Sequence, residues 1–105
     1  MDVILKKSKS VKYKYVAIIT ISSASSKKGK KIKKVNFGAK GYSDFLKHKD
    51  VERKRRYILR HKKKEDWTDP LTAGFWSRWL LWNKSTIELS IKDIEKRFDI
   101  TITLK

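Results

Sequence analysis

The sequence of 105 residues contains no cysteine, one proline, four glycines and few acidic residues. Without cysteine there can be no disulfide, no thiolate metal ligand and no thiol nucleophile, so packing alone has to hold the fold together. No run approaches the ~18 apolar residues of a membrane span. Residues 1–7 also lack the basic-then-apolar order of a signal peptide. We therefore expect no membrane span and a site of action inside a cell or a particle.

The shortage of acidic residues leaves a strong positive charge. Lysine and arginine number 28 against 11 acidic residues, which gives a formal net charge of +17. Self-repulsion on this scale works against a compact fold and is usually tolerated where a partner supplies the counter-charge. Nucleic acid, an anionic membrane face and an acidic protein surface are the candidate partners. An inert, solubilising basic surface is the plainer alternative.

The charge is concentrated in the middle of the chain. Residues 23–66 contain 17 basic and 5 acidic residues, a net of +12, whereas residues 67–105 contain 6 and 5, a net of +1. Three of the four tryptophans lie close together in this nearly neutral last third. We therefore expect the last third to build the packed body and the middle to carry the electrostatic function.

Two segments predict a β-hairpin near the start of the chain. Residues 11–22 are rich in β-branched and aromatic residues, and their first half alternates apolar residues with lysine. Residues 32–38 alternate in the same way. Between them, residues 22–31 combine serine with lysine and have no apolar period, which is typical of a flexible basic loop.

Helices are predicted in the second half. Asp50 is a candidate N-cap for a helix that runs to about Lys64, and a second helix is expected over residues 72–82, after the break at Asp69-Pro70. Ser85 and Glu88 have the spacing of a capping box before a third helix, whose apolar face repeats through residues 87, 91, 94 and 98. Residues 100–105 alternate like a closing strand. The order predicts an α+β protein, a single small domain over residues 1–105 in which the N-terminal β-hairpin and C-terminal strand pack with about three helices.

Two basic clusters are the candidate polyanion-binding residues. The first lies on the hairpin and contains Lys27, Lys28, Lys30, Lys31, Lys33 and Lys34. The second lies on the first helix and contains Arg53, Lys54, Arg55, Arg56, Arg60, Lys62, Lys63 and Lys64. If such a patch neutralised about six phosphates, log K would fall with log salt with a slope near −5. No motif for reading bases is present, so any contact with nucleic acid should be non-specific.

The tryptophan-rich segment has two interpretations. Trp76, Trp79 and Trp82 fall on one stripe of the expected helix with Phe75, which is more often core than surface. Tryptophan is also enriched in protein interfaces and in sites that stack bases. We take Trp76, Trp79 and Trp82 as candidate protein-interface residues and leave the core interpretation open.

No group of residues predicts an enzyme. His48 and His61 lie among lysines and have no carboxylate at a known metal-site spacing. The acids Glu65, Asp66 and Asp69 are better explained as turn and cap residues than as a catalytic pair. We expect no catalytic residue, no metal, no cofactor and no small-molecule substrate.

Several segments resemble a family of small, basic, uncharacterised proteins from large nucleocytoplasmic DNA viruses. The resemblance covers roughly residues 35–98 and rests on residues 35–45, 48–50, 56–58, 60–61, 67–69, 72–84 and 90–94. It implies a virus particle as the setting and supplies no mechanism. The expected role is a minor capsid or cement protein in the virion interior, with the host nucleus or viral factory as the location before assembly. Its tryptophan-rich helix would dock onto capsid protein, and its basic hairpin and helix would contact an acidic capsid surface or the genome. The alternative is a non-specific DNA- or RNA-binding protein that neutralises packaged nucleic acid.

Overall fold

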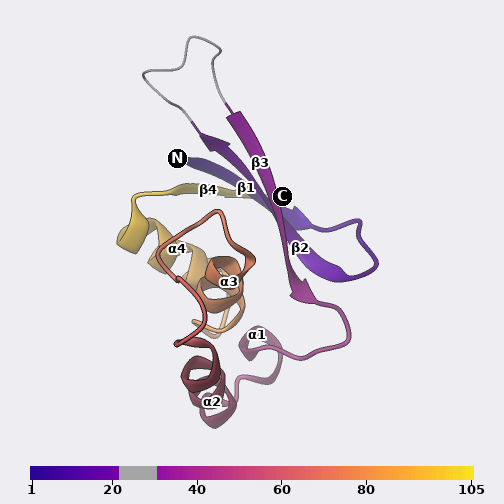
Figure 1. The fold of residues 1–105 in the computed structure, drawn as a ribbon, viewed down its shortest axis with the longest axis vertical. Coiled ribbons are helices and arrows are strands. Elements are labelled where there is room, and N and C mark those ends of the chain that lie inside the picture. The colour runs from indigo at the N-terminus through magenta and orange to yellow at the C-terminus, as the bar shows by residue number, and fades with distance from the viewer. Residues whose placement is uncertain (22–30) are drawn as a thin grey trace.

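The computed structural model of the protein describes residues 1–21 and 31–105, which form a four-stranded sheet with helices packed on one face (Figure 1). The elements in chain order are β1 (Asp2–Lys7), β2 (Tyr13–Ile21), β3 (Lys31–Ala39), α1 (Phe45–His48), α2 (Val51–His61), α3 (Ala73–Trp76), η1 (Ser77–Leu81), α4 (Ile87–Phe98) and β4 (Thr101–Leu104). The predicted α+β class, with an N-terminal hairpin and a C-terminal strand, is confirmed. The basic loop expected at residues 22–31 lies, apart from Lys31, outside the described residues.

The sheet is mixed, with strand order β3-β2-β1-β4. β2 is antiparallel to both of its neighbours, and β4 runs parallel to β1. The apolar run from Val16 to Ile19 therefore lies in a central strand. β1 was not predicted, because its apolar residues are too few to show a period. The backbone N–H of Lys105 donates to the carbonyl of Leu5 at 2.8 Å, which ties the two ends of the chain together.

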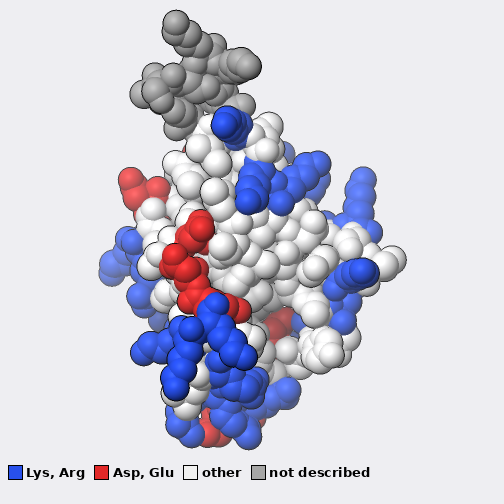
Figure 2. All heavy atoms as spheres, in the orientation of Figure 1, with Lys and Arg blue, Asp and Glu red and all other residues white. Residues whose placement is uncertain are grey.

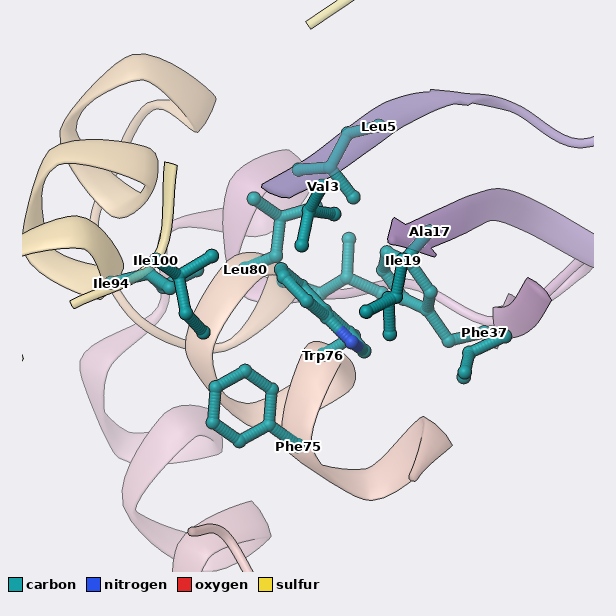
Figure 3. Packing of buried hydrophobic residues seen from close by; sticks show 12 residues of the cluster. Val3, Leu5, Ala17, Ile19, Phe37, Phe75, Trp76, Leu80, Ile94 and Ile100 are labelled. Carbon is teal, nitrogen blue, oxygen red and sulfur yellow. The ribbon is translucent and has the colours of Figure 1, made fainter. Parts of the chain in front are cut away.

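The core lies between the sheet and the helices that follow it (Figure 3). Alternate residues of the three N-terminal strands point into it, as the period of two in a strand requires. Its sheet side consists of Val3, Leu5, Ala17, Ile19, Val35 and Phe37. Its helix side consists of Phe75, Trp76, Leu80, Leu81 and Ile94, together with Ile100 just before β4. The expected packing of the last helix through Ile94 is confirmed, and residues 87, 91 and 98 are partly buried beside it.

The tryptophan-rich segment is not the single regular helix that its spacing predicted. α3 ends at Trp76 and continues as a π-helical turn, in which the N–H of Trp82 donates to the carbonyl of Ser77 at 3.0 Å. A π turn inserts an extra residue into the helix and shifts the faces of the residues around it. Leu80 and Leu81, which are neighbours in sequence, are both buried as a result.

Two predicted helix limits also need correction. Asp50 does cap α2, accepting from the N–H groups of Glu52 at 3.0 Å and Arg53 at 3.2 Å, but the helix ends at His61 and not at Lys64. α4 is capped by Thr86, whose hydroxyl accepts from the N–H of Leu89 at 3.2 Å. The expected cap at Ser85 is therefore wrong by one residue.

Candidate polyanion-binding surface

α2 contacts the rest of the protein through a narrow stripe. Tyr57 is its one buried residue, and the ring lies flat against Trp82, with the centroids 4.4 Å apart and the planes at 2°. His61 stacks on the other face of the Tyr57 ring at 4.3 Å. Val51 and Leu59 are apolar but exposed, and Ile58 is partly buried. The rest of the helix surface consists of polar and charged side chains.

Seven cationic side chains project from α2 and the turn after it. We call them the α2 cationic cluster: Arg53, Arg55, Arg56, Arg60, Lys62, Lys63 and Lys64, all exposed. On the face shown in Figure 2, basic side chains gather at the lower end, where α2 lies in Figure 1, and a stripe of acidic side chains borders them. Of these seven side chains, only Arg55 has an ion-pair partner within the described residues, Glu52 at 2.6 Å. The other six cations of the cluster form no ion pair there and can meet an external anion.

Lys54 does not belong to this surface, although the sequence placed it there. Its Nζ donates to the carbonyl of Asn83 at 2.6 Å and lies 5.0 Å from the centre of the Phe45 ring. Burial lowers the pKa of the Lys54 ammonium, and the nearby cations Arg78 and Lys84 lower it further. The side chain joins α2 to the segment after η1 and is not free to bind a partner.

The structure does not bring the two predicted basic clusters together. Lys31, Lys33 and Lys34 are exposed on β3, whose first residues lie at the opposite end of the molecule from α2 (Figure 1). Lys33 and Lys34 are neighbours in an extended strand, so their side chains lie on opposite faces of the sheet. Lys27, Lys28 and Lys30 lie outside the described residues. In the described part of the chain, the cluster on α2 therefore has more exposed cations than the cluster on the hairpin.

Trp76 is a core residue, so its predicted role in an interface is wrong. It is 0% exposed, and its Nε1 donates to the carbonyl of Pro70 at 2.7 Å. Trp79 and Trp82 are half-buried, and the Nε1 of Trp79 donates to the carbonyl of Trp67 at 2.8 Å. Their role in an interface stays a prediction. Trp76 became a candidate because a helical stripe alone cannot tell the core side from the surface side.

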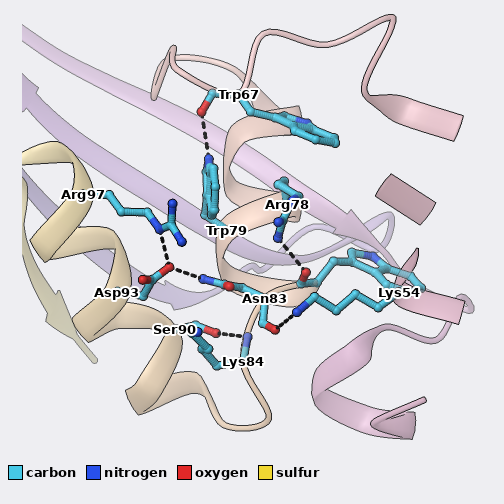
Figure 4. A network of polar contacts seen from close by, with 10 residues as sticks. Lys54, Trp67, Arg78, Trp79, Asn83, Lys84, Ser90, Asp93 and Arg97 are labelled. Carbon is cyan, nitrogen blue, oxygen red and sulfur yellow. Dashed lines mark hydrogen bonds and ion pairs between the residues drawn. The ribbon is translucent and has the colours of Figure 1, made fainter. Parts of the chain in front are cut away.

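A network of hydrogen bonds fixes the segment between η1 and α4 (Figure 4). Lys54 donates to the carbonyl of Asn83 in the same segment. The carboxylate of Asp93 accepts from the side chains of Asn83 and Arg97, each at 2.8 Å. Burial alone would raise the pKa of Asp93, but these two hydrogen bonds lower it, so the carboxylate stays charged. Arg78 donates to the carbonyl of Trp82 at 2.9 Å. The network fixes Asn83 and Trp82, the two residues on which α2 rests.

A cleft of about 700 Å³ lies between α2, α3 and the end of the sheet where β2 begins and β3 ends. Arg53, Arg56 and Arg60 line it from α2, one helical turn or two apart, while Tyr13 and Tyr42 line it from the sheet end. Sequence reasoning found the arginines and missed the tyrosines. No pattern in the sequence marks Tyr42 as exposed.

The histidines and the acids near residue 65 have local structural roles. Nδ1 of His48 accepts from the N–H of Asp50 at 2.9 Å, and burial and the charge of Arg53 lower the pKa of this ring. Glu65 accepts from Nε1 of Trp67 at 3.0 Å and lies 3.1 Å from Nδ1 of His61. In residues 1–21 and 31–105, no three histidine or acidic side chains come together as a metal site would need. None of the helices described there is long and apolar enough to span a membrane.

The fold and this surface define a class of protein: a small α+β domain with a cationic helix, α2, beside a cleft that tyrosines and arginines line. A family model described as a family of unknown function, DUF5754, matches residues 3–61, more than half of the chain. The chain belongs to this family. The match runs from β1 to the end of α2, so it includes the α2 arginines and stops before the tryptophan-rich segment. No curated protein and no solved structure matches the chain. The viral setting implied by the resemblance stays a prediction.

Proposed function

We propose that the protein binds nucleic acid without sequence specificity, through the α2 cationic cluster, and that it acts by binding and not by catalysis. The observation that carries this proposal is the row Arg53, Arg56 and Arg60, exposed on one side of α2 and without an ion-pair partner in the described residues. Guanidinium groups bind phosphate through paired N–H donors, and nucleic acid presents phosphates in regular succession.

The division of charge within the molecule supports the same proposal. Residues 50–65 carry eight basic and three acidic residues, a net of +5 in one short segment. Their helix rests on the body through Tyr57 and Lys54, and the cations of the α2 cationic cluster stay exposed. Non-specific binding to DNA or RNA needs only such a surface, because phosphate contacts carry no sequence information.

The role as a minor capsid or cement protein stays a prediction that rests on the resemblance. One of its three docking residues, Trp76, is buried and cannot meet a capsid protein in this structure. In virus particles, release of the protein by salt together with the DNA would favour the genome as partner. Retention on stripped shells would favour the capsid.

Fluorescence anisotropy with labelled oligonucleotides tests the proposed function directly. Two duplexes of unrelated sequence should bind with similar affinity, and raising salt from about 50 to 200 mM should weaken binding by about 10³-fold if about six phosphates are contacted. Polyglutamate, which has charge but no phosphate, should compete poorly. Absence of binding at low salt would contradict the proposal, and equally tight binding of polyglutamate would point to an acidic protein partner instead.

A further inference from the structure

Two hollows in the surface meet at Tyr42. The first is the cleft described above, which we call the α2 cleft. The second has a volume of about 630 Å³ and is lined by Lys7, Lys40 and Lys47 among others. We call it the lysine hollow. Both are lined by Lys14, Tyr42, Ser43 and Asp44, so the two hollows adjoin at the loop that follows β3.

The cations that line these hollows outnumber the carboxylates. Asp44 is buried and forms an ion pair with Lys14 at 2.7 Å. Glu65 receives the Trp67 indole N–H and contacts His61. Glu65 keeps its negative charge, but three arginines without an ion-pair partner in the described residues line the same cleft: Arg53, Arg56 and Arg60. In the lysine hollow the paired Asp44 is the only carboxylate among the lining residues that the structure describes. Both hollows are therefore suited to negatively charged groups.

Between the cations, two tyrosines present their rings to solvent. Tyr42 is 75% exposed and Tyr13 is 38% exposed. Tyr42 follows Gly41, whose φ of 90° is a backbone conformation that glycine adopts without strain, and its carbonyl accepts from Nζ of Lys14. The backbone of the loop is thus held while the Tyr42 ring stays free. Proteins bind single strands with exposed aromatic rings that lie beside cations.

We propose that Tyr42 and Tyr13 stack the bases of single-stranded nucleic acid, whose phosphates contact the α2 arginines on one side and the lysine hollow on the other. This inference rests on the proposed function and narrows its ligand from nucleic acid in general to the single strand. Duplex bases are already stacked on one another and cannot enter a concave site, so a duplex would contact only the outer phosphates. A free nucleotide has the same chemistry but occupies only one hollow.

The test measures the affinity of the full chain for a labelled oligothymidylate and for a hairpin duplex of equal charge. Tyr42→Ala should weaken single-strand binding by about 5-fold to 150-fold, the range that loss of base stacking gives. Duplex binding should change by less than about twofold, because it uses phosphates only. Tyr42→Phe keeps the ring and should bind like the unmodified protein.

A matched pair of variants separates the cleft from general electrostatics. Arg56 and Lys63 are exposed members of the α2 cationic cluster without an ion-pair partner in the described residues, but only Arg56 lines the cleft. Arg56→Ala and Lys63→Ala change the net charge equally, and Arg56→Ala should weaken single-strand binding more than Lys63→Ala. Equal effects of the two substitutions would mean that charge alone matters and would overturn the proposed path.

The possible outcomes distinguish this inference from the function on which it rests. If neither single strand nor duplex binds, the proposed function and the path fail together. If both bind with strong salt dependence while Tyr42→Ala has no effect, the function stands and the single-strand path is overturned. If thymidine monophosphate competes as well as the oligonucleotide at equal phosphate concentration, the hollow takes a free nucleotide and the path is again overturned.

Discussion

Replacing Tyr57 by alanine tests how α2 is held to the body. Tyr57 is 6% exposed, and its ring lies between Trp82 and His61. Burial of about 150 Å² of a tyrosine ring at ~25 cal/mol/Å² contributes about 4 kcal/mol. Measured truncations of buried aromatic residues to alanine fall at about 3–5 kcal/mol. We therefore expect Tyr57→Ala to lower the free energy of unfolding by about 4 kcal/mol.

Urea denaturation followed by tryptophan fluorescence measures this loss, because unfolding exposes Trp76, Trp79 and Trp82 to water. Tyr57→Phe is the matched control. It keeps the ring and removes only the hydroxyl, so the free energy of unfolding should change by less than about 1 kcal/mol. If Tyr57→Ala costs as little as Tyr57→Phe, the ring does not hold α2 and the account of this helix is wrong.

Three further predictions concern residues whose role the structure changed or explained. Trp76→Ala should lower the free energy of unfolding by about 3–5 kcal/mol in the same assay. A loss below about 1 kcal/mol would contradict the burial of this side chain. Lys54→Ala should cost about 1.5 kcal/mol of stability, because a charged hydrogen bond is lost, and should leave the salt slope of nucleic-acid binding unchanged; a shallower slope would show that Lys54 contacts phosphate. The folded pKa of His48 lies below its ordinary value of 6.5, so the unfolded state binds more protons just below that pH. Stability should therefore fall as the pH drops from 6.5 towards the folded pKa, and level off below it. In melting curves measured across this range, His48→Gln should show a smaller loss of stability. An unchanged loss in the variant would assign the pH dependence to another group.

Much of the fold could be predicted from local patterns. The alternation in residues 11–22 and 32–38 predicted the hairpin, Asp50 predicted the start of α2, and the apolar spacing around Ile94 predicted the inner face of α4. These features are set by residues close together in the sequence, and the strand and helix periods are visible there. The concentration of charge in residues 50–65 also predicted which helix carries the exposed cations.

The remaining features depend on contacts between distant residues. β1 is a strand because β2 and β4 pair with it, although its own residues show no period. Lys54 looked like its neighbours on α2, and only its contact with Asn83, 29 positions away, takes it out of the cationic surface. Tyr42 and Arg56 meet around one cleft only after the chain has folded. No sequence period indicates such pairs.

The salt dependence of binding in a triple variant tests the central claim most directly. Arg53→Ala, Arg56→Ala and Arg60→Ala together remove three cations from the proposed phosphate contacts. For a short duplex, the slope of log K against log salt should then become shallower by about 2.7, at about 0.9 for each lost contact. Lys31→Ala, Lys33→Ala and Lys34→Ala together remove the same charge from the other end of the molecule and should change the slope much less. Equal changes in the two variants, or no change in either, would contradict the assignment of binding to α2.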